Sequence, residues 1–217
     1  MDYPTARWHE KDLIKYFSDK NVENFFLSDN LAMFTLSKEI IEPNILDCGC
    51  ACGQLNQLIK KYFKKWNYTG IDLVKEQIDI AKKKYPNKKF IFSNIEECSS
   101  NELGKFDIVY CVGVFQHVEG FNWLLRKLVD LSKNYIVFDL KSNLDNKNIT
   151  DINTSSTGKN DKRLLYNIYC EKWLVDQIKS YKEIKNIYKF SYESKPNKKH
   201  IITEKINFFD TTFILKL

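Results

Sequence analysis

The feature that most constrains the fold of this chain is an alternation of short apolar runs with longer amphipathic segments. The first run begins after Pro43, and others lie at 68–72, 89–94, 106–112 and 135–140. Their length and composition predict β-strands. The fourth run is apolar almost throughout, as expected for a strand buried on both faces. Strands that alternate with helices predict a mainly parallel sheet whose ligands bind at the carboxyl ends of the strands.

The segments between these runs predict helices, as in the stretch 55–63, where apolar residues recur at helical spacing. Residues 10–41 carry apolar positions at mixed helical spacing and predict a helical cap. Near the C-terminus, a helix precedes the strand-like runs 186–193 and 207–216, which can pair antiparallel. We therefore expect a doubly wound, seven-stranded, mainly parallel α/β sheet with an antiparallel C-terminal hairpin and an N-terminal helical cap.

The stretch that carries chemistry is 45–53, where the first run ends in a turn of glycine and small residues. Glycine at a strand-to-helix turn lets a ligand approach the backbone and permits positive φ. Asp72 ends the second run, where an acidic side chain can accept both hydroxyl groups of a ribose. These features predict an adenosine-containing cofactor. A dinucleotide fingerprint G-x-G-x-x-G would need a small residue at position 54, which is Gln54.

With Asp47 in front of G-x-A-x-G, the sequence resembles the small-molecule branch of the class I S-adenosylmethionine-dependent methyltransferases, whose first motif is an acidic residue followed by G-x-G-x-G. The resemblance extends over 43–140. Ala51 replaces the middle glycine of the motif, and Asn94 replaces the acid that often follows the third strand. The resemblance implies a Rossmann-like fold, methyl transfer, S-adenosylmethionine as cofactor with S-adenosylhomocysteine as product, and no metal.

The resemblance also assigns parts of the cofactor to residues. It implies that Asp72 binds the ribose, that Leu73 lies beside the adenine and that Asn94 meets the adenine amino group. The backbone near Cys111 would face the methionine end, and Arg7 in an N-terminal flap could pair with the methionine carboxylate. The cofactor-binding residues expected on this basis are Arg7, Asp47, Gly49, Cys50, Ala51, Gly53, Asp72, Leu73, Gln77, Asn94, Ile95, Cys111 and Gln116.

His117 is the candidate catalytic residue. The stretch 114–118 is similar to the small-molecule branch, in which a histidine often follows the fourth strand at the mouth of the pocket. Because the pKa of histidine is near working pH, His117 could remove a proton from an oxygen or nitrogen nucleophile. The alternative is a histidine at the start of a helix that only hydrogen-bonds the backbone.

The residues that would bind the acceptor are less specific. Motifs of methyltransferases that act on adenine or glutamine amino groups, on cytosine C5 or on protein arginine are missing, which favours a small polar or carbohydrate-linked acceptor methylated on oxygen or nitrogen. Residues of the flap and of the long polar loop could hold an anionic or sugar-like group, and a solvated terminus or charge run is the open alternative. This substrate-binding set is Tyr3, Trp8, His9, Lys141, Asn143, Arg163, Tyr166 and Tyr169.

The length of 217 residues predicts a single methyltransferase domain. We divide it into an N-terminal cap or flap (1–42), a cofactor-binding core (43–140), a loop or lid (141–169) and a C-terminal helix with a hairpin (170–217). The polar run 141–163 has almost no periodicity, and loops of such length are usually lids or disordered segments.

Charge and cysteine content bear on partners. The net charge of +6 comes almost entirely from lysine, which favours solubility over specific nucleic-acid contacts. No apolar window reaches ~18 residues and no signal peptide is evident, so we expect a cytoplasmic monomer or homodimer without a membrane or nucleic-acid partner. Cys48, Cys50 and Cys52 lack the C-x2-C pairs of zinc sites. The alternatives are a tRNA or rRNA methyltransferase and a catalytically silent cofactor-binding or partner-binding protein.

Overall fold

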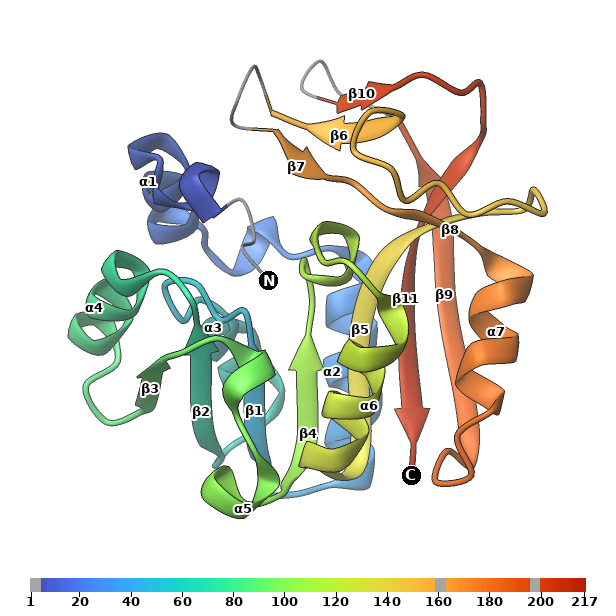
Figure 1. The fold of residues 1–217 in the computed structure, drawn as a ribbon. Helices are drawn as coiled ribbons and strands as arrows, with labels where there is room; N and C mark the ends of the chain where they lie inside the picture. Colours follow the sequence, from blue (N-terminus) through green and yellow to red (C-terminus); the bar gives the residue numbers. More distant parts are fainter. Residues whose placement is uncertain (1–4, 159–162, 196–199) are drawn as a thin grey trace.

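The alternating runs form a central twisted sheet with helices on both faces, as seen in the computed structural model, which describes residues 5–158, 163–195 and 200–217 (Figure 1). The main path of the sheet has the strand order β3-β2-β1-β4-β5-β11-β9. These strands are β3 (Lys89–Phe92), β2 (Asn67–Asp72), β1 (Asn44–Cys48), β4 (Phe106–Cys111), β5 (Ser132–Asn143), β11 (Phe208–Lys216) and β9 (Asn186–Ser194).

The first five strands of this path are parallel, and β11 runs antiparallel to both of its neighbours, β5 and β9. This arrangement confirms the predicted doubly wound sheet and its antiparallel C-terminal hairpin. An eighth strand, β8 (Ile168–Cys170), was not predicted and pairs in parallel with the end of β5. The direction of winding reverses between β1 and β4, and ligands of open α/β sheets bind at such a reversal.

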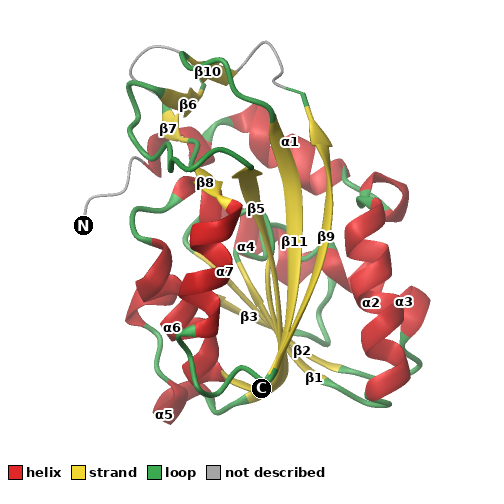
Figure 2. Ribbon diagram, turned by 90° about the vertical axis from the view of Figure 1, so that its right-hand side faces the viewer, coloured by secondary structure: helices red, strands yellow, loops and turns green. Residues whose placement is uncertain are grey.

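Two helical layers bury the sheet (Figure 2). One face is covered by α2, α3 and α4, and the other by α5, α6 and α7, because each longer helix presents an apolar stripe such as Leu124, Leu125 and Leu128 of α6. The bounds of these helices are α2 (Leu27–Glu39), α3 (Leu55–Tyr62), α4 (Lys75–Lys84), α5 (Ser100–Leu103), α6 (Phe121–Leu131) and α7 (Glu171–Lys179).

The predicted N-terminal cap consists of two parts. The 3-10 helix η1 (Thr5–His9) and α1 (Lys11–Asp19) lie over the carboxyl ends of the parallel strands, whereas α2 packs on a face of the sheet (Figure 1). A turn containing the 3-10 helix η2 (Val22–Asn24) separates them. Lys84 Nζ of α4 donates to the backbone oxygen of Ser18, and Gln57 Nε2 of α3 donates to that of Lys20 over 3.3 Å. The end of α1 is therefore attached to α3 and α4.

The segment 141–169 was expected to be a loop, but strands of a second, three-stranded sheet lie within it. This sheet has the order β10-β6-β7, is antiparallel and lies beyond the carboxyl end of β5 (Figure 1). Its strands are β6 (Ser155–Thr157), β7 (Leu164–Leu165) and β10 (His200–Ile202). Such short strands leave no periodic signal, and β6 pairs with a strand that is distant in sequence. Part of the expected lid, 159–162, lies outside the described residues. None of the helices in the described ranges is long and apolar enough to cross a membrane.

Candidate functional site

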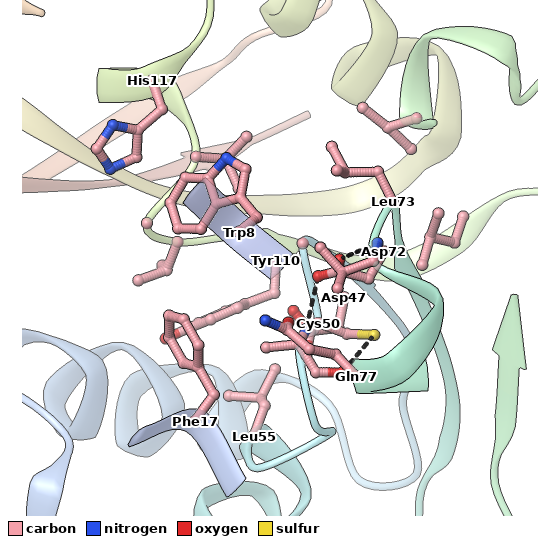
Figure 3. A pocket seen from close by; sticks show the side chains of 18 of the residues that line it. Trp8, Phe17, Asp47, Cys50, Leu55, Asp72, Leu73, Gln77, Tyr110 and His117 are labelled. Carbon is pink, nitrogen blue, oxygen red and sulfur yellow. Dashed lines mark hydrogen bonds between the residues drawn. The ribbon is translucent and has the colours of Figure 1, made fainter. Parts of the chain in front are cut away.

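A cavity of about 380 Å³ lies at the carboxyl ends of β1, β2 and β4, where the winding of the sheet reverses (Figure 3). Tyr16 and Phe17 of α1 line it from the cap, and Leu73 and Val74 line it from the turn after β2. This volume falls within the usual range for sites that bind small molecules.

The turn after β1 approaches this cavity in a conformation that few residues adopt. Gly49 has φ +77°, and a Cβ added there would lie 2.6 Å from Cγ2 of Val114. The backbone N–H groups of Gly49 and Cys50 both donate to the carbonyl oxygen of Ile71, over 2.8 and 3.0 Å. Ala51 also has a positive φ, +47°, the single non-glycine example among the described residues. The turn is thus held tightly against the end of β2.

Asp72 connects this turn to the next helix. Its Oδ2 accepts a hydrogen bond from the N–H of Ala51 over 2.8 Å, and its Oδ1 accepts one from the N–H of Val74 over 2.9 Å. Burial raises the pKa of Asp72, and the backbone donors oppose that rise. Since each carboxylate oxygen has two lone pairs, Asp72 keeps acceptor capacity for the hydroxyl groups of a ligand.

Asp47 is a second acid of the site, and it is buried. Its Oδ2 accepts a hydrogen bond from the hydroxyl group of Tyr68 over 2.6 Å. Burial raises the pKa of Asp47 to about 7; the bond from Tyr68 lowers it and the neighbouring charge of Asp72 raises it. Asp47 is therefore only partly ionised near neutral pH.

Three glutamine side chains of the cavity present buried polar atoms that have no hydrogen-bond partner within the described part of the chain. They are Nε2 of Gln77, which is a donor, and Oε1 of Gln54 and of Gln116, which are acceptors. A buried polar atom without a partner is costly, and a bound ligand can supply the partner. Adenosine carries hydroxyl, amino and ring-nitrogen groups that suit this set, so the residues present fit the expected cofactor.

His117 lies at another side of the cavity, beside Trp8, with the two ring centroids 5.1 Å apart (Figure 3). Its Nδ1 is 2.7 Å from the carbonyl oxygen of Leu165, which can only accept, so Nδ1 carries the proton and Nε2 keeps its lone pair. Burial lowers the pKa of His117 to about 4; the carbonyl of Leu165 opposes this, and the positive charges of Lys141 and other groups add to it. The imidazole is therefore neutral at pH 7.

The turn that carries His117 is fixed by Asn167. This asparagine donates through its backbone N–H to the carbonyl of Gln116 over 2.8 Å, and through Nδ2 to those of Val118 over 2.7 Å and Phe115 over 3.3 Å. These bonds hold η4 (Phe115–His117) at the edge of the second sheet. The position of His117 thus depends on the segment between β7 and β8.

The structure brings many of the predicted residues to the cavity and leaves others away from it. Those that line it are Trp8, Asp47, Gly49, Cys50, Ala51, Asp72, Leu73, Gln77, Asn94, Ile95, Gln116, His117 and Lys141. Those that do not line it are Arg7, His9, Gly53, Cys111, Asn143, Arg163, Tyr166 and Tyr169, and Tyr3 lies outside the described residues.

Several of the residues that do not line the cavity have structural contacts instead. Arg7 is 3.7 Å from the carboxylate of Glu10, and Nδ1 of His9 is 3.2 Å from that of Glu76. Asn143 donates to the backbone oxygen of Lys147. Tyr166 lies behind two cavity residues: its ring centroid is 6.2 Å from that of His117 and 5.9 Å from the ammonium of Lys141.

Two acidic residues are among the cavity residues that the sequence analysis did not name. Asp29 of α2 accepts hydrogen bonds from the hydroxyl of Tyr110 over 2.7 Å and from the N–H of Phe26 over 3.1 Å. Asp139 accepts one from the N–H of Gly113 over 2.6 Å, and burial raises its pKa to about 6. A charged residue at the carboxyl end of the apolar run 135–140 was a usable signal for Asp139. Tyr110, Lys20 and Gln54 are further polar residues of the cavity that were not predicted.

No group of three His, Cys, Asp or Glu side chains within the described ranges is arranged to hold a metal ion. All six cysteines are buried and free, and Cys48, Cys50 and Cys52 lie in or beside the β1 turn. Small thiol side chains fill space in this turn, where burial raises the pKa of the Cys50 thiol.

Comparison with known proteins identifies the core. Residues 45–134 match the family described as "Methyltransferase domain". A malonyl-[acyl-carrier protein] O-methyltransferase from Priestia megaterium is 34% identical over 89 residues, which are 40% of this chain and 32% of that protein. A mitochondrial ubiquinone biosynthesis O-methyltransferase from Saccharomyces cerevisiae is 33% identical over 90 residues, 39% of this chain and 28% of that protein. The match thus spans about a third of these relatives.

The fold extends the likeness to the whole chain. The N-terminal domain of EvdMO1, solved in the presence of S-adenosylhomocysteine and D-fucose, has a TM-score of 0.65 at 13% identity, and the match covers 100% of this chain and 97% of that one. At this level of identity, the likeness shows a Rossmann-like methyltransferase fold. The resemblance to S-adenosylmethionine-dependent methyltransferases seen in the sequence is confirmed over residues 45–134, which are about two fifths of the chain.

Proposed function

We propose that the protein transfers a methyl group from S-adenosylmethionine to an oxygen or nitrogen atom of a small acceptor. The observation that carries this proposal is the presence, in one cavity, of the β1 turn, the Asp72 carboxylate and a neutral histidine. The cofactor supplies an electrophilic methyl group on a sulfonium ion. The protein has to bind it, align the acceptor with it and accept a proton from the acceptor.

The cofactor side of the cavity is formed by the β1 turn and the end of β2. We assign the ribose hydroxyl groups to the remaining acceptor positions of Asp72 and the unpartnered donor of Gln77 to the same end of the ligand. Leu73 and Ile95 provide an apolar surface for the adenine, and Asn94 provides polar groups beside it. Gly49 allows the backbone to approach the ligand closely.

His117 is proposed to act on the acceptor. Because Nδ1 is occupied by the carbonyl of Leu165, Nε2 is the atom that can accept a proton. The pKa of about 4 corrects the expectation of a pKa near working pH: it keeps this atom unprotonated throughout the physiological range and makes it a weaker base than an ordinary histidine. The hydrogen bond to the backbone, which was the alternative role expected for His117, therefore orients the ring and leaves its second nitrogen available.

The acceptor is proposed to be small and polar or carbohydrate-linked. Trp8 offers a ring beside His117, and Lys141 offers a charged group at the same side of the cavity. The neighbour EvdMO1 was solved with D-fucose, which supports a sugar-like acceptor for this chain as well. A cytoplasmic location, a monomeric or homodimeric state and the absence of a nucleic-acid partner remain predictions.

Calorimetric titration with S-adenosylmethionine and S-adenosylhomocysteine tests cofactor binding, and incubation with methyl-labelled cofactor and a fractionated small-molecule extract tests transfer. We expect binding of both compounds and label in one small-molecule fraction. Replacing His117 by Ala should lower turnover by about 10²–10⁴-fold at unchanged cofactor affinity. No heat from either compound contradicts the proposal.

The two alternatives give different results. A tRNA or rRNA methyltransferase would label RNA and would be retained on RNA in a way that weakens steeply with salt. A catalytically silent protein would bind the cofactor but label no fraction of any extract.

A further inference from the structure

Lys20 is a cation in the cavity that the proposed chemistry leaves unused. It follows α1 directly and lines the cavity from the cap. Its Nζ lies 4.4 Å from the centroid of the Phe25 ring, and burial lowers the pKa of Lys20. Its charge is attracted by three carboxylates, Asp29, Asp139 and Asp47.

Those carboxylates have other hydrogen-bond donors. Asp29 accepts hydrogen bonds from the hydroxyl of Tyr110 and the N–H of Phe26, Asp47 accepts one from Tyr68, and Asp139 accepts one from the N–H of Gly113. None of the three lies within 4.0 Å of the Lys20 ammonium, and no ion pair of Lys20 occurs among the residues that the structure describes. The three N–H donors of Lys20 are therefore available to an anion that enters the cavity.

Arg7, the residue expected from the sequence to bind the methionine carboxylate, is placed differently. It is paired with Glu10 and does not line the cavity. Lys20 lines the cavity near Asp47 of β1 and Asp139 of β5. Of these two basic residues of the cap, Lys20 alone meets the cavity.

We infer that Lys20 binds the carboxylate of the methionine portion of the cofactor, an inference that rests on the proposed function. An α-amino acid group carries one positive and one negative charge. The surrounding carboxylates suit its ammonium group, and Lys20 suits its carboxylate. The ligand thereby gives the Lys20 ammonium a close counter-charge in a partly desolvated position.

The backbone around Lys20 is already positioned for this contact. Its carbonyl oxygen accepts from Gln57 of α3, and that of Ser18 accepts from Lys84 of α4. Of these two helices, α3 follows the β1 turn and α4 carries Gln77. Binding at Lys20 therefore joins the cap to the elements that hold the adenosine portion.

The test compares two ligands that differ in the amino acid group. S-adenosylhomocysteine carries it, and 5′-methylthioadenosine keeps the adenosine and the thioether but lacks it. Calorimetric titration is carried out on the wild type and on Lys20→Met, Lys20→Arg and Arg7→Met. We expect Lys20→Met to lower the affinity for S-adenosylhomocysteine by about 10- to 100-fold, the range for hydrogen bonds to charged groups. The affinity for 5′-methylthioadenosine should stay within about twofold of the wild-type value.

The matched variants separate charge from shape and one cap residue from the other. Lys20→Arg should keep most of the wild-type affinity for S-adenosylhomocysteine. Arg7→Met should change the affinity for either ligand by no more than about twofold. Circular dichroism and thermal unfolding establish that each variant is folded, and Lys20→Gln replaces Lys20→Met if the latter is not.

Each outcome has a distinct meaning. If the wild type binds neither ligand, the proposed function itself fails. If the wild type binds S-adenosylhomocysteine but Lys20→Met binds it equally well, or loses both ligands in parallel, the assignment of Lys20 is wrong. A selective loss in Arg7→Met alone would assign the carboxylate to Arg7 and overturn the inference as well.

Discussion

Ala51 has a side chain that conflicts with its backbone conformation. Its φ of +47° is strained for any residue with a Cβ, and it stands where the related motif has glycine. We expect Ala51→Gly to raise the free energy of unfolding by roughly 0.5–1 kcal/mol, since relief of strain outweighs the added freedom of the unfolded chain. Urea denaturation measures the change.

The matched control is Gly49→Ala in the same turn. A Cβ there meets both a positive φ and Val114 at 2.6 Å, so this variant should lose roughly 2 kcal/mol or more. A lower stability of Ala51→Gly than of the wild type would show that the alanine is not strained.

Asp47 makes the stability of the protein depend on pH. Its pKa is about 7 in the folded protein and 3.8 ordinarily, so between these values the unfolded chain has lost a proton that the folded one retains. The free energy of unfolding therefore falls as pH rises from about 4 to about 7. We expect Asp47→Asn to remove this contribution. The free energy of unfolding of the variant minus that of the wild type should therefore be higher at pH 8 than at pH 5, by roughly 2–4 kcal/mol.

Urea denaturation at the two pH values checks this prediction, with Asp145→Asn, an exposed aspartate, as the control. Equal differences at pH 5 and pH 8 would contradict a raised pKa of Asp47. Because Asp47 lies in the cavity, the same variant should also bind cofactor differently, so stability and binding are measured separately.

At the residue scale, sequence predicts what is local in the chain. Asp47, Gly49 and Asp72 were found because their positions relative to the strand ends define their role. Asp29 and Lys20 were missed because they reach the cavity from a cap whose packing has no local signal, and the bond between Tyr110 and Asp29 spans 81 positions.

At the scale of elements, η4 is held by the segment between β7 and β8 through Asn167. Asn167→Ala removes the two side-chain bonds to the carbonyls of Phe115 and Val118. We expect a loss of roughly 1–3 kcal/mol in the free energy of unfolding, and lower turnover at unchanged affinity for S-adenosylhomocysteine. Denaturation and calorimetry measure these effects, and imidazole NMR signals of His117 report its displacement directly.

Asn122→Ala is the matched control, since Asn122 donates to Gln177 on the exposed surface. It should leave the signals of His117 and the turnover unchanged. Unaltered His117 signals in Asn167→Ala would show that Asn167 does not position the histidine.

The elements themselves were predictable where their pattern is strong. The strands β1 to β5 and β11 follow from clear apolar runs, and the predicted doubly wound, mainly parallel sheet is confirmed. The strands β6, β7 and β10 are two or three residues long, and their pairing depends on contacts distant in sequence. The expected loop was therefore the weakest part of the predicted fold.

At the scale of the whole molecule, the bound ligand should stabilise the folded state. A ligand that binds only the folded state at 100 times its dissociation constant adds about 2.7 kcal/mol to the free energy of unfolding. For a domain of this size, that raises the unfolding midpoint by roughly 5–10 °C. Thermal unfolding with S-adenosylhomocysteine, and with homocysteine alone as the control, measures the effect. An equal shift with homocysteine would contradict binding through the adenosine portion.

The attachment of the cap has a consequence for how this chain can vary. Lys84 donates to the backbone oxygen at position 18 and Gln57 to that at position 20, and every amino acid has such an oxygen. The cap is thus anchored without regard to which side chains stand at these two positions. A substitution at position 18 or 20 therefore leaves these two hydrogen bonds of the cap in place. The side chain at position 20 can then vary with the ligand, and related chains can change the residue that contacts the methionine end of the cofactor while they keep the fold.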